Sequence, residues 1–196
     1  AHHLGLVRAE EAGTGPRVEL VLVDLGKGEQ RQPGYLKLNP NGRVPTLEDG
    51  TFALSESHAI MQYLADSTPG QTVYPTELRA RADVNRWLFW NAHHFQPAVS
   101  VLRWEHQVKR FLGQGDPDPS EVARGERLVH QCAQVLDAHL AEREWIAQDR
   151  LTLADLAIST PLTGAAQAKL PIEGYANIAA WMGRMQELPA WKKTSL

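Results

Sequence analysis

The chain has 196 residues, enough for one compact domain or two small ones, and 43% of them are apolar, which is sufficient for a buried core. Its 20 basic and 23 acidic residues nearly balance, so no nucleic-acid partner is expected. No apolar run approaches the roughly 20 residues that span a bilayer. Cys132 is the single cysteine and cannot form an internal disulfide. We therefore expect a cytoplasmic protein without a membrane partner.

The first part of the chain carries the signals of a small α/β domain. β-Branched residues and turn dipeptides predict strands, and apolar residues at helical spacing predict helices. The expected elements are a strand at 18–23, a short irregular helix at 32–38, a hairpin around Asp49-Gly50 with strands at 46–48 and 52–54, and an amphipathic helix at 56–66. Proline and glycine at positions 69, 70 and 75 then mark a linker.

The remainder of the chain is predicted to be helical. Apolar residues from Val84 to Leu102 keep a 3.6-residue period through a long helix, which Pro97 should bend. Ser120 is expected to cap the next helix, whose apolar face comprises Leu128, Val129, Cys132, Val135, Leu136 and Leu140. Thr152 and Asp155 have the spacing of a capping box that opens a buried helix through position 162. A last helix is expected at 178–187.

The stretch 39–64, NPNGRVPTLEDGTFALSESHAIMQYL, contains the residues best suited to binding a ligand. Pro45 has no N–H and a fixed φ, so the backbone groups of Val44 before it can pair with an extended ligand. Ser57 lies in the first turn of the predicted helix, where free N–H groups and the helix dipole favour an anion. Glu56 beside it can accept an ammonium group. The pattern predicts a site for a peptide-like ligand that carries carboxylates and an amine.

Each of these residues also has a purely structural interpretation. Glu56-Ser57 alone could be only a helix cap, because both residue types are common at helix starts. Val44-Pro45 twelve residues upstream favours the ligand. Arg43 could be a solvated loop residue or could form a forked contact with a carboxylate.

At these residues the sequence resembles the cytosolic glutathione transferase superfamily. Its members have a cis-proline after a valine and a Glu/Gln-Ser pair that binds the γ-glutamyl end of glutathione, matched here by Val44-Pro45 and Glu56-Ser57. Arg43 stands where the family often places a basic residue near the glycine carboxylate. The likeness extends to 29–41, 151–157 and 175–191, and so to nearly the whole chain.

The resemblance implies an α/β thioredoxin-like N-terminal domain over 1–66, a linker over 67–78 and an all-α helical domain over 79–196. Family members begin with a strand and a loop whose Tyr, Ser or Cys contacts the glutathione sulfur. Residues 1–13 instead resemble the helix that follows, and no Ser, Thr, Tyr or Cys precedes Thr14. We therefore expect an incomplete N-terminal domain without its first strand, by truncation rather than natural loss, since loss would weaken the sheet. The catalytic residue is left unassigned.

The function implied by the resemblance is that of a detoxifying transferase, which conjugates or reduces small hydrophobic electrophiles with glutathione as co-substrate. The alternative is a non-catalytic binding or scaffold protein of the same fold. Conjugation, peroxidase and dehalogenase activities all stay open. A homodimer is expected, with its surface on the helix at 56–66, which carries Met61 and Tyr63, and on the helix at 79–90.

Other conspicuous residues are interpreted mainly as structural. Trp87, Trp90, Phe95 and Trp104 are expected to lie mostly in the core, although Trp90, His94 and Arg103 could line a cleft for the electrophile. Cys132 is expected to be a buried, inert thiol. No metal is expected, because adjacent histidines on a helix point apart and no His-x-x-x-His or Cys-x-x-Cys spacing occurs.

Overall fold

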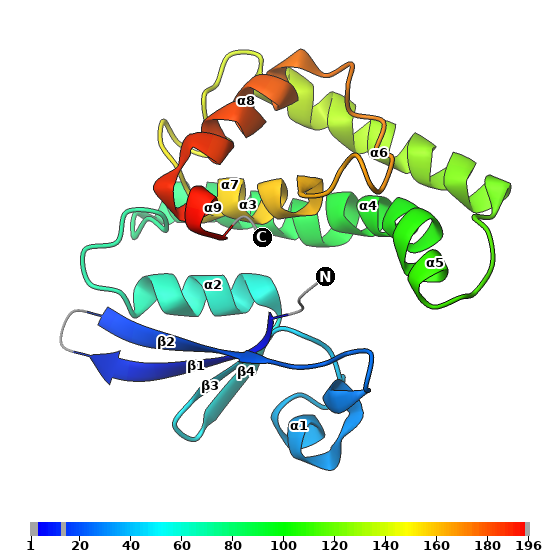
Figure 1. Cartoon of the computed structure of the whole chain (residues 1–196). Coiled ribbons are helices and arrows are strands. Elements are labelled where there is room, and N and C mark those ends of the chain that lie inside the picture. The colour runs from blue at the N-terminus through cyan, green and yellow to red at the C-terminus, as the bar shows by residue number, and fades with distance from the viewer. Residues whose placement is uncertain (1–3, 13–14, 195–196) are drawn as a thin grey trace. The chain divides into compact units, whose positions relative to one another are not determined.

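The computed structural model describes residues 4–12 and 15–194, and the side chains of residues 18–193. The chain divides into two compact units, Ala1–Tyr74 and Pro75–Leu196 (Figure 1). The first is an α/β unit and the second is helical, and each is described by itself. This agrees with the fold class implied by the sequence.

The α/β unit is built on a four-stranded sheet in the order β2-β1-β3-β4. Its strands are β1 (Leu4–Ala12), β2 (Gly15–Leu22), β3 (Thr46–Asp49) and β4 (Phe52–Ser55). Strand β1 is antiparallel to β2 and parallel to β3, and β3 and β4 form an antiparallel hairpin. The strand predicted at 18–23, which corresponds to β2, and the predicted hairpin around Asp49-Gly50 are confirmed.

The N-terminal segment differs from the prediction. Residues 4–12 form β1, so the expected helix over this segment and the expected sheet without a first strand are both wrong. Residues 1–3 and 13 lie outside the described part of the chain. The physical reason is pairing: β1 lies between β2 and β3 and hydrogen-bonds along both edges. Helix propensity is a weak preference that such tertiary pairing overrides.

Three helical segments complete this unit: η1 (Glu29–Arg31), α1 (Pro33–Leu38) and α2 (Ser57–Asp66). Buried Val23 and Tyr35 form one small core, against which Leu38 and Val44 pack. Leu47 and Ile60 form a second, which Tyr63 joins. Tyr63, which was expected on the dimer surface of α2, thus contacts the core of its own unit. Its hydroxyl donates to the Asp49 carboxylate over 2.5 Å, and its ring packs against that of Phe52.

Among the described residues of the second unit, every regular element is helical. The elements are α3 (Leu78–Trp90), η2 (Asn91–Phe95), α4 (Gln96–Arg103), η3 (Trp104–Val108), α5 (Lys109–Phe111), α6 (Pro119–Leu140), α7 (Leu153–Ser159), η4 (Thr160–Leu162), α8 (Ala176–Glu187) and α9 (Pro189–Thr194). Its core contains Trp87 and Trp181, both almost completely buried. In the described part of the chain, no helix combines the length and apolar character needed to span a membrane.

Pro97 disturbs the long helix in a specific way. A π-helical turn, η2, separates α3 from α4, and Pro97 lies in the first turn of α4. Proline lacks an N–H, and its ring clashes with the carbonyl four residues earlier, which here belongs to His93. The wider π turn accommodates that break. The second π turn, η3, was not predicted.

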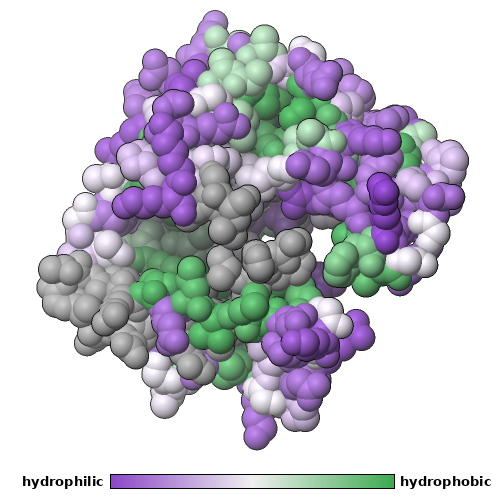
Figure 2. Space-filling model, viewed as in Figure 1, coloured by the Kyte–Doolittle hydropathy of each residue, from purple (hydrophilic) through white to green (hydrophobic). Residues whose placement is uncertain are grey.

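Three expectations for the helical unit need correction. Asp118, not Ser120, caps α6: its carboxylate accepts from the N–H and hydroxyl of Ser120. A carboxylate is an acceptor only, so the Ser120 hydroxyl becomes its donor. Val135 is 52% exposed and Trp104 is 42% exposed, so neither is a core residue. Figure 2 shows an apolar patch over α5, where Phe111 is 80% exposed.

Candidate ligand site of the α/β unit

The β3–β4 hairpin brings the two halves of the predicted site together. Thr46 at the start of β3 pairs with Ser55 at the end of β4, and opposed residues of an antiparallel pair have Cα atoms about 4.5–5.5 Å apart. Val44-Pro45 directly precedes Thr46, and Glu56-Ser57 directly follows Ser55. Residues separated by twelve positions in the sequence therefore meet at one end of the hairpin.

Val44 offers backbone groups at this end of the hairpin. It lies outside the strands, and its peptide bond to Pro45 is cis. Its side chain packs against the core formed by Val23 and Tyr35. Among the described residues, no hydrogen-bond partner is found for the Val44 N–H. The backbone here can accept an extended ligand as if it were a further strand.

Glu56 has a backbone conformation that is rare for a residue with a side chain. Its φ is 71° and its ψ is 114°, whereas non-glycine residues avoid positive φ. Strain of this kind is concentrated at functional sites, where the surroundings hold it in place. Glu56 is the N-cap of α2, yet its side chain makes no capping hydrogen bond. Its exposed carboxylate is therefore not occupied by the helix end.

The first turn of α2 begins at Ser57, where the amide groups of a helix start have no intrahelical acceptor. Together with the hydroxyl of half-buried Ser57, these groups favour a carboxylate. His58 follows, and burial lowers the pKa of its imidazole below the ordinary value, an effect that the nearby Glu56 charge opposes. His58 is therefore neutral at neutral pH and contributes no positive charge to the site.

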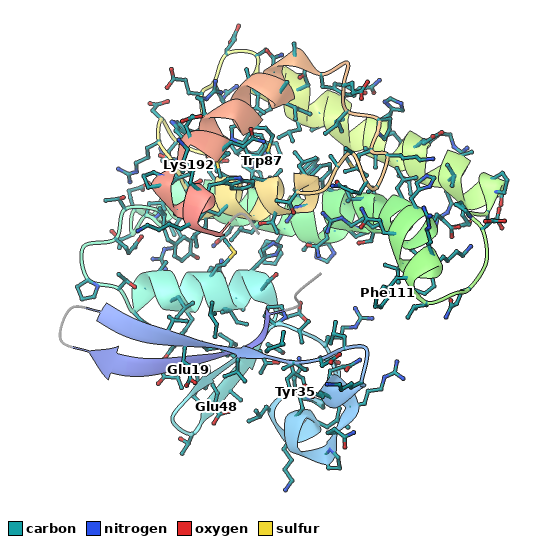
Figure 3. The ribbon with its side chains drawn as sticks, in the orientation of Figure 1. Glu19, Tyr35, Glu48, Trp87, Phe111 and Lys192 are labelled. Atoms are coloured by element: carbon teal, nitrogen blue, oxygen red, sulfur yellow. The ribbon has the colours of Figure 1, made fainter. Side chains whose placement is uncertain are left out.

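Arg43 is exposed, but its carbonyl is held inside the unit. That oxygen accepts from the Tyr35 hydroxyl over 2.7 Å and from the Asn39 side-chain amide over 2.8 Å. The Tyr35 hydroxyl also lies 2.7 Å from the Thr46 hydroxyl. Figure 3 shows Tyr35 on the side of α1 nearest the strands. Sequence reasoning missed these three polar residues. The Asn39-Pro40-Asn41-Gly42 turn sequence was the signal that could have indicated Asn39.

The residues predicted to line an electrophile cleft lie in the helical unit. Trp90 is half-buried at the end of α3 and stacks on Phe95, with ring centroids 5.6 Å apart. His94 is exposed in η2. Arg103, at the end of α4, donates to the carbonyls of Pro161 and Thr163. Burial lowers the pKa of its guanidinium. Arg103 is thus already engaged in hydrogen bonds to η4 and to the residue that follows it.

Comparison with protein families gives a match in each unit. A model described as "Glutathione S-transferase, N-terminal domain" matches residues 7–66, and one described as "Glutathione S-transferase, C-terminal domain" matches residues 90–189. Together these cover most of the chain, and the first contains all four residues predicted to bind the ligand.

Individual relatives agree with the family match. A "Glutathione S-transferase" of Silene vulgaris is 37% identical over 184 residues, covering 90% of this chain and 84% of that protein. "Glutathione S-transferase 3" of Zea mays is 38% identical over 185 residues, covering 90% and 81%. A solved structure of glutathione S-transferase-I bound with lactoylglutathione is 27% identical, with a TM-score of 0.79, and the match covers 89% of this chain and 84% of that one.

Proposed function

The chain belongs to the glutathione S-transferase family, and from this premise we propose that the end of the β3–β4 hairpin is its glutathione site. The activity is that of a glutathione transferase. The observation that carries the site assignment is the Thr46–Ser55 register, which unites Val44-Pro45 with Glu56-Ser57. These residues supply acceptors and donors that match a γ-glutamyl tripeptide.

Each group of glutathione has a counterpart at this site. The backbone N–H and C=O of Val44 pair with the cysteinyl backbone, as in strand addition. Glu56 takes the ammonium of the γ-glutamyl residue, and Ser57 with the first amides of α2 takes its α-carboxylate. Arg43 forms a charge-assisted contact with the glycine carboxylate. The Glu56 carboxylate, which makes no capping hydrogen bond to α2, and the positive φ of this residue support the assignment.

The chemistry requires the thiolate of glutathione, because the thiolate and not the thiol is the nucleophile. The thiol proton leaves to solvent or to a base, the sulfur forms a bond to the electrophilic carbon, and the leaving group departs with its electron pair. A hydrogen-bond donor at the sulfur favours the anion and so lowers the pKa of the thiol. Holding both ends of the tripeptide fixes where that sulfur lies.

We assign the small hydrophobic electrophile to the helical unit, with Trp90 and His94 as its contacts. Trp90 offers an aromatic face, and His94 is exposed one turn further along. Arg103 was proposed for the same cleft, but its bonds to two carbonyls favour a supporting role. Trp90→Ala should therefore raise KM for the electrophile and leave KM for glutathione unchanged.

A homodimer is part of the proposal. Helix α3 exposes two large apolar side chains, Leu78 at 79% and Phe89 at 64%. The two side chains lie about three turns apart on the same side of the helix, so both can belong to one contact surface. A two-fold isologous contact is the commonest way to cover such a surface. Met61 of α2 is half-buried and stays a candidate for the same interface.

The site assignment is tested by the double variant Glu56→Ala/Ser57→Ala. It should lose retention on immobilised glutathione, since it removes the ammonium acceptor and one carboxylate donor together, while the circular dichroism spectrum stays unchanged. Glu19→Ala, which removes an exposed carboxylate on β2, is the control and should be retained like the parent. A double variant that binds like the parent would refute the assignment.

A further inference from the structure

A buried polar cluster lies beside Arg43 and Val44, two of the residues proposed to bind glutathione. It consists of Tyr35 on α1, Asn39 after that helix and Thr46 on β3, which are 9%, 2% and 0% exposed. All three side chains converge on the same backbone oxygen, the carbonyl of Arg43. Tyr35 and Asn39 donate to it over 2.7 and 2.8 Å, and the Thr46 hydroxyl lies 3.5 Å away.

The contacts among the three side chains define one consistent set of donors. The Tyr35 hydroxyl proton goes to the Arg43 carbonyl, so the 2.7 Å contact between hydroxyls is a donation from Thr46 to Tyr35. One amide proton of Asn39 goes to the Arg43 carbonyl and the other to the Thr46 hydroxyl oxygen over 3.2 Å. Every proton of the cluster is then used, and both lone pairs of the carbonyl are occupied.

The cluster also fixes the turn that leads into Arg43. The side-chain oxygen of Asn39 accepts from the Asn41 N–H over 3.1 Å, and the Gly42 N–H donates to the Asn39 carbonyl over 3.0 Å. Gly42 has a φ of 58°, and a Cβ there would lie 3.1 Å from the Gln30 carbonyl oxygen. The backbone on both sides of Arg43 is therefore restrained.

We propose that Tyr35, Asn39 and Thr46 act as a positioning clamp that presents the Val44 N–H to glutathione. The Arg43–Val44 peptide bond is trans, so its C=O and N–H point in opposite directions from one rigid plane. Holding the carbonyl toward the buried cluster turns the Val44 N–H away from it, and that N–H has no partner among the described residues. The inference rests on the proposed function, in which Val44 pairs with the ligand backbone.

Positioning and plain stabilisation predict different measurements. If the cluster only stabilised the fold, variants that remove one of its hydrogen bonds would have a lower melting temperature. The folded fraction of those variants would bind glutathione as before. If the cluster instead sets the direction of the Val44 N–H, removing one of its hydrogen bonds weakens glutathione binding in the folded protein itself. The loss should be about three- to tenfold in Kd, the equivalent of one hydrogen bond to the ligand.

The test compares two tyrosine variants of the full chain by titration calorimetry with glutathione. Tyr35→Phe removes the hydroxyl that holds the Arg43 carbonyl and should raise Kd by about three- to tenfold. Tyr63→Phe removes a hydroxyl of the same unit that is bound to Asp49 instead, and it should leave Kd within about twofold of the parent. Thr46→Ser keeps the bridging hydroxyl and should bind like the parent. Thr46→Val removes the hydroxyl that orients Tyr35 and Asn39 but leaves both donors to the Arg43 carbonyl, so it should weaken binding less than Tyr35→Phe does.

Amide hydrogen exchange at Val44 gives a second, direct readout. Glutathione should protect this N–H in the parent and in Tyr63→Phe, and protect it less in Tyr35→Phe. If Tyr35→Phe and Thr46→Val bind like the parent while Glu56→Ala/Ser57→Ala loses binding, the clamp is refuted and the glutathione site stands. If Glu56→Ala/Ser57→Ala also binds like the parent, the site assignment itself is refuted and the clamp with it.

Discussion

The indole N–H of Trp181 donates to the carboxylate of Asp155 over 3.0 Å, which joins α8 to the first turn of α7. The same carboxylate accepts from the N–H of Ile146 and from the N–H and hydroxyl of Thr152. The predicted capping box of Thr152 and Asp155 is thus confirmed, and its carboxylate accepts from two further donors, the Ile146 N–H and the Trp181 indole. Burial raises the pKa of the Asp155 carboxyl, and the four donors counteract that effect.

Replacing Asp155 with Ala should destabilise the helical unit severely. The change leaves the Ile146 N–H and the Trp181 indole N–H buried without an acceptor, which should cost about 3–5 kcal/mol. Asp118 caps α6 from an exposed position, so Asp118→Ala should cost only about 1 kcal/mol. Urea unfolding of the two variants measures the free energy of unfolding that each one loses. Equal losses would contradict the claim that the buried donors of Asp155 make its replacement more costly.

Gly125 of α6 should not tolerate alanine, because this helix lies very close to α4. A Cβ at Gly125 would lie 2.8 Å from Cδ2 of Leu102, which is completely buried. We expect a loss of about 1–3 kcal/mol from overpacking. Gly183 of α8 has nothing within 4 Å of its Cβ position, so Gly183→Ala should gain about 0.5–1 kcal/mol from helix propensity. Stabilisation by both substitutions would refute this account of the contact.

His58 should titrate below its ordinary value of 6.5, because burial disfavours the imidazolium. At a pH between the pKa of His58 in the folded protein and its pKa in the unfolded chain, the unfolded chain therefore binds more protons than the folded protein. The contribution of this group to stability is therefore present above pH 6.5 and lost as the pH falls toward the folded pKa. Glu56→Ala removes the charge that favours imidazolium, so the pKa of His58 should fall further. Titration by NMR checks both statements, and a rise in Glu56→Ala would contradict them.

The proposed dimer should depend on α3. Sedimentation equilibrium at micromolar concentration should give the mass of two chains, and Phe89→Asp should shift it toward one, because a charge would be buried in the contact. Phe111→Asp places the same charge on α5, which is not part of the proposed dimer surface on α2 and α3, and should leave the mass unchanged. A one-chain mass for the parent refutes the dimer.

Elements with short-range signals could be predicted from the sequence. The hairpin has a turn dipeptide, α2 has an apolar stripe, and the box at Thr152 and Asp155 has its own spacing. Strand β1 escaped prediction because its residues also suit a helix. Only its pairing with β2 along one edge and with the more distant β3 along the other makes it a strand. The choice of Asp118 over Ser120 as the cap of α6 also escaped prediction, because both residue types cap helices and only the fold decides between them.

The residues of the candidate site also divide into those with a short-range sequence signal and those that only the fold brings together. Val44-Pro45 and Glu56-Ser57 stand out in the sequence because proline and helix-start residues have strong local preferences. Tyr35 and Thr46 do not stand out, since a tyrosine and a threonine eleven positions apart carry no local pattern. Tyr35 and Thr46 meet only when α1 contacts β3 in the folded unit, and only then do both hydroxyls lie near the carbonyl of Arg43.

The two ends of the β3–β4 hairpin have opposite tolerances to change. At the open end, the distance between the two segments proposed to bind the ligand is set by one residue pair, so an inserted residue there would separate them. At the closed end, Gly50 and Thr51 are both exposed and join Asp49 to Phe52. Extra residues added there would lengthen a surface loop and leave the pairing near the ligand intact. That turn is therefore a suitable place for a label or an affinity tag in a protein that must still bind glutathione.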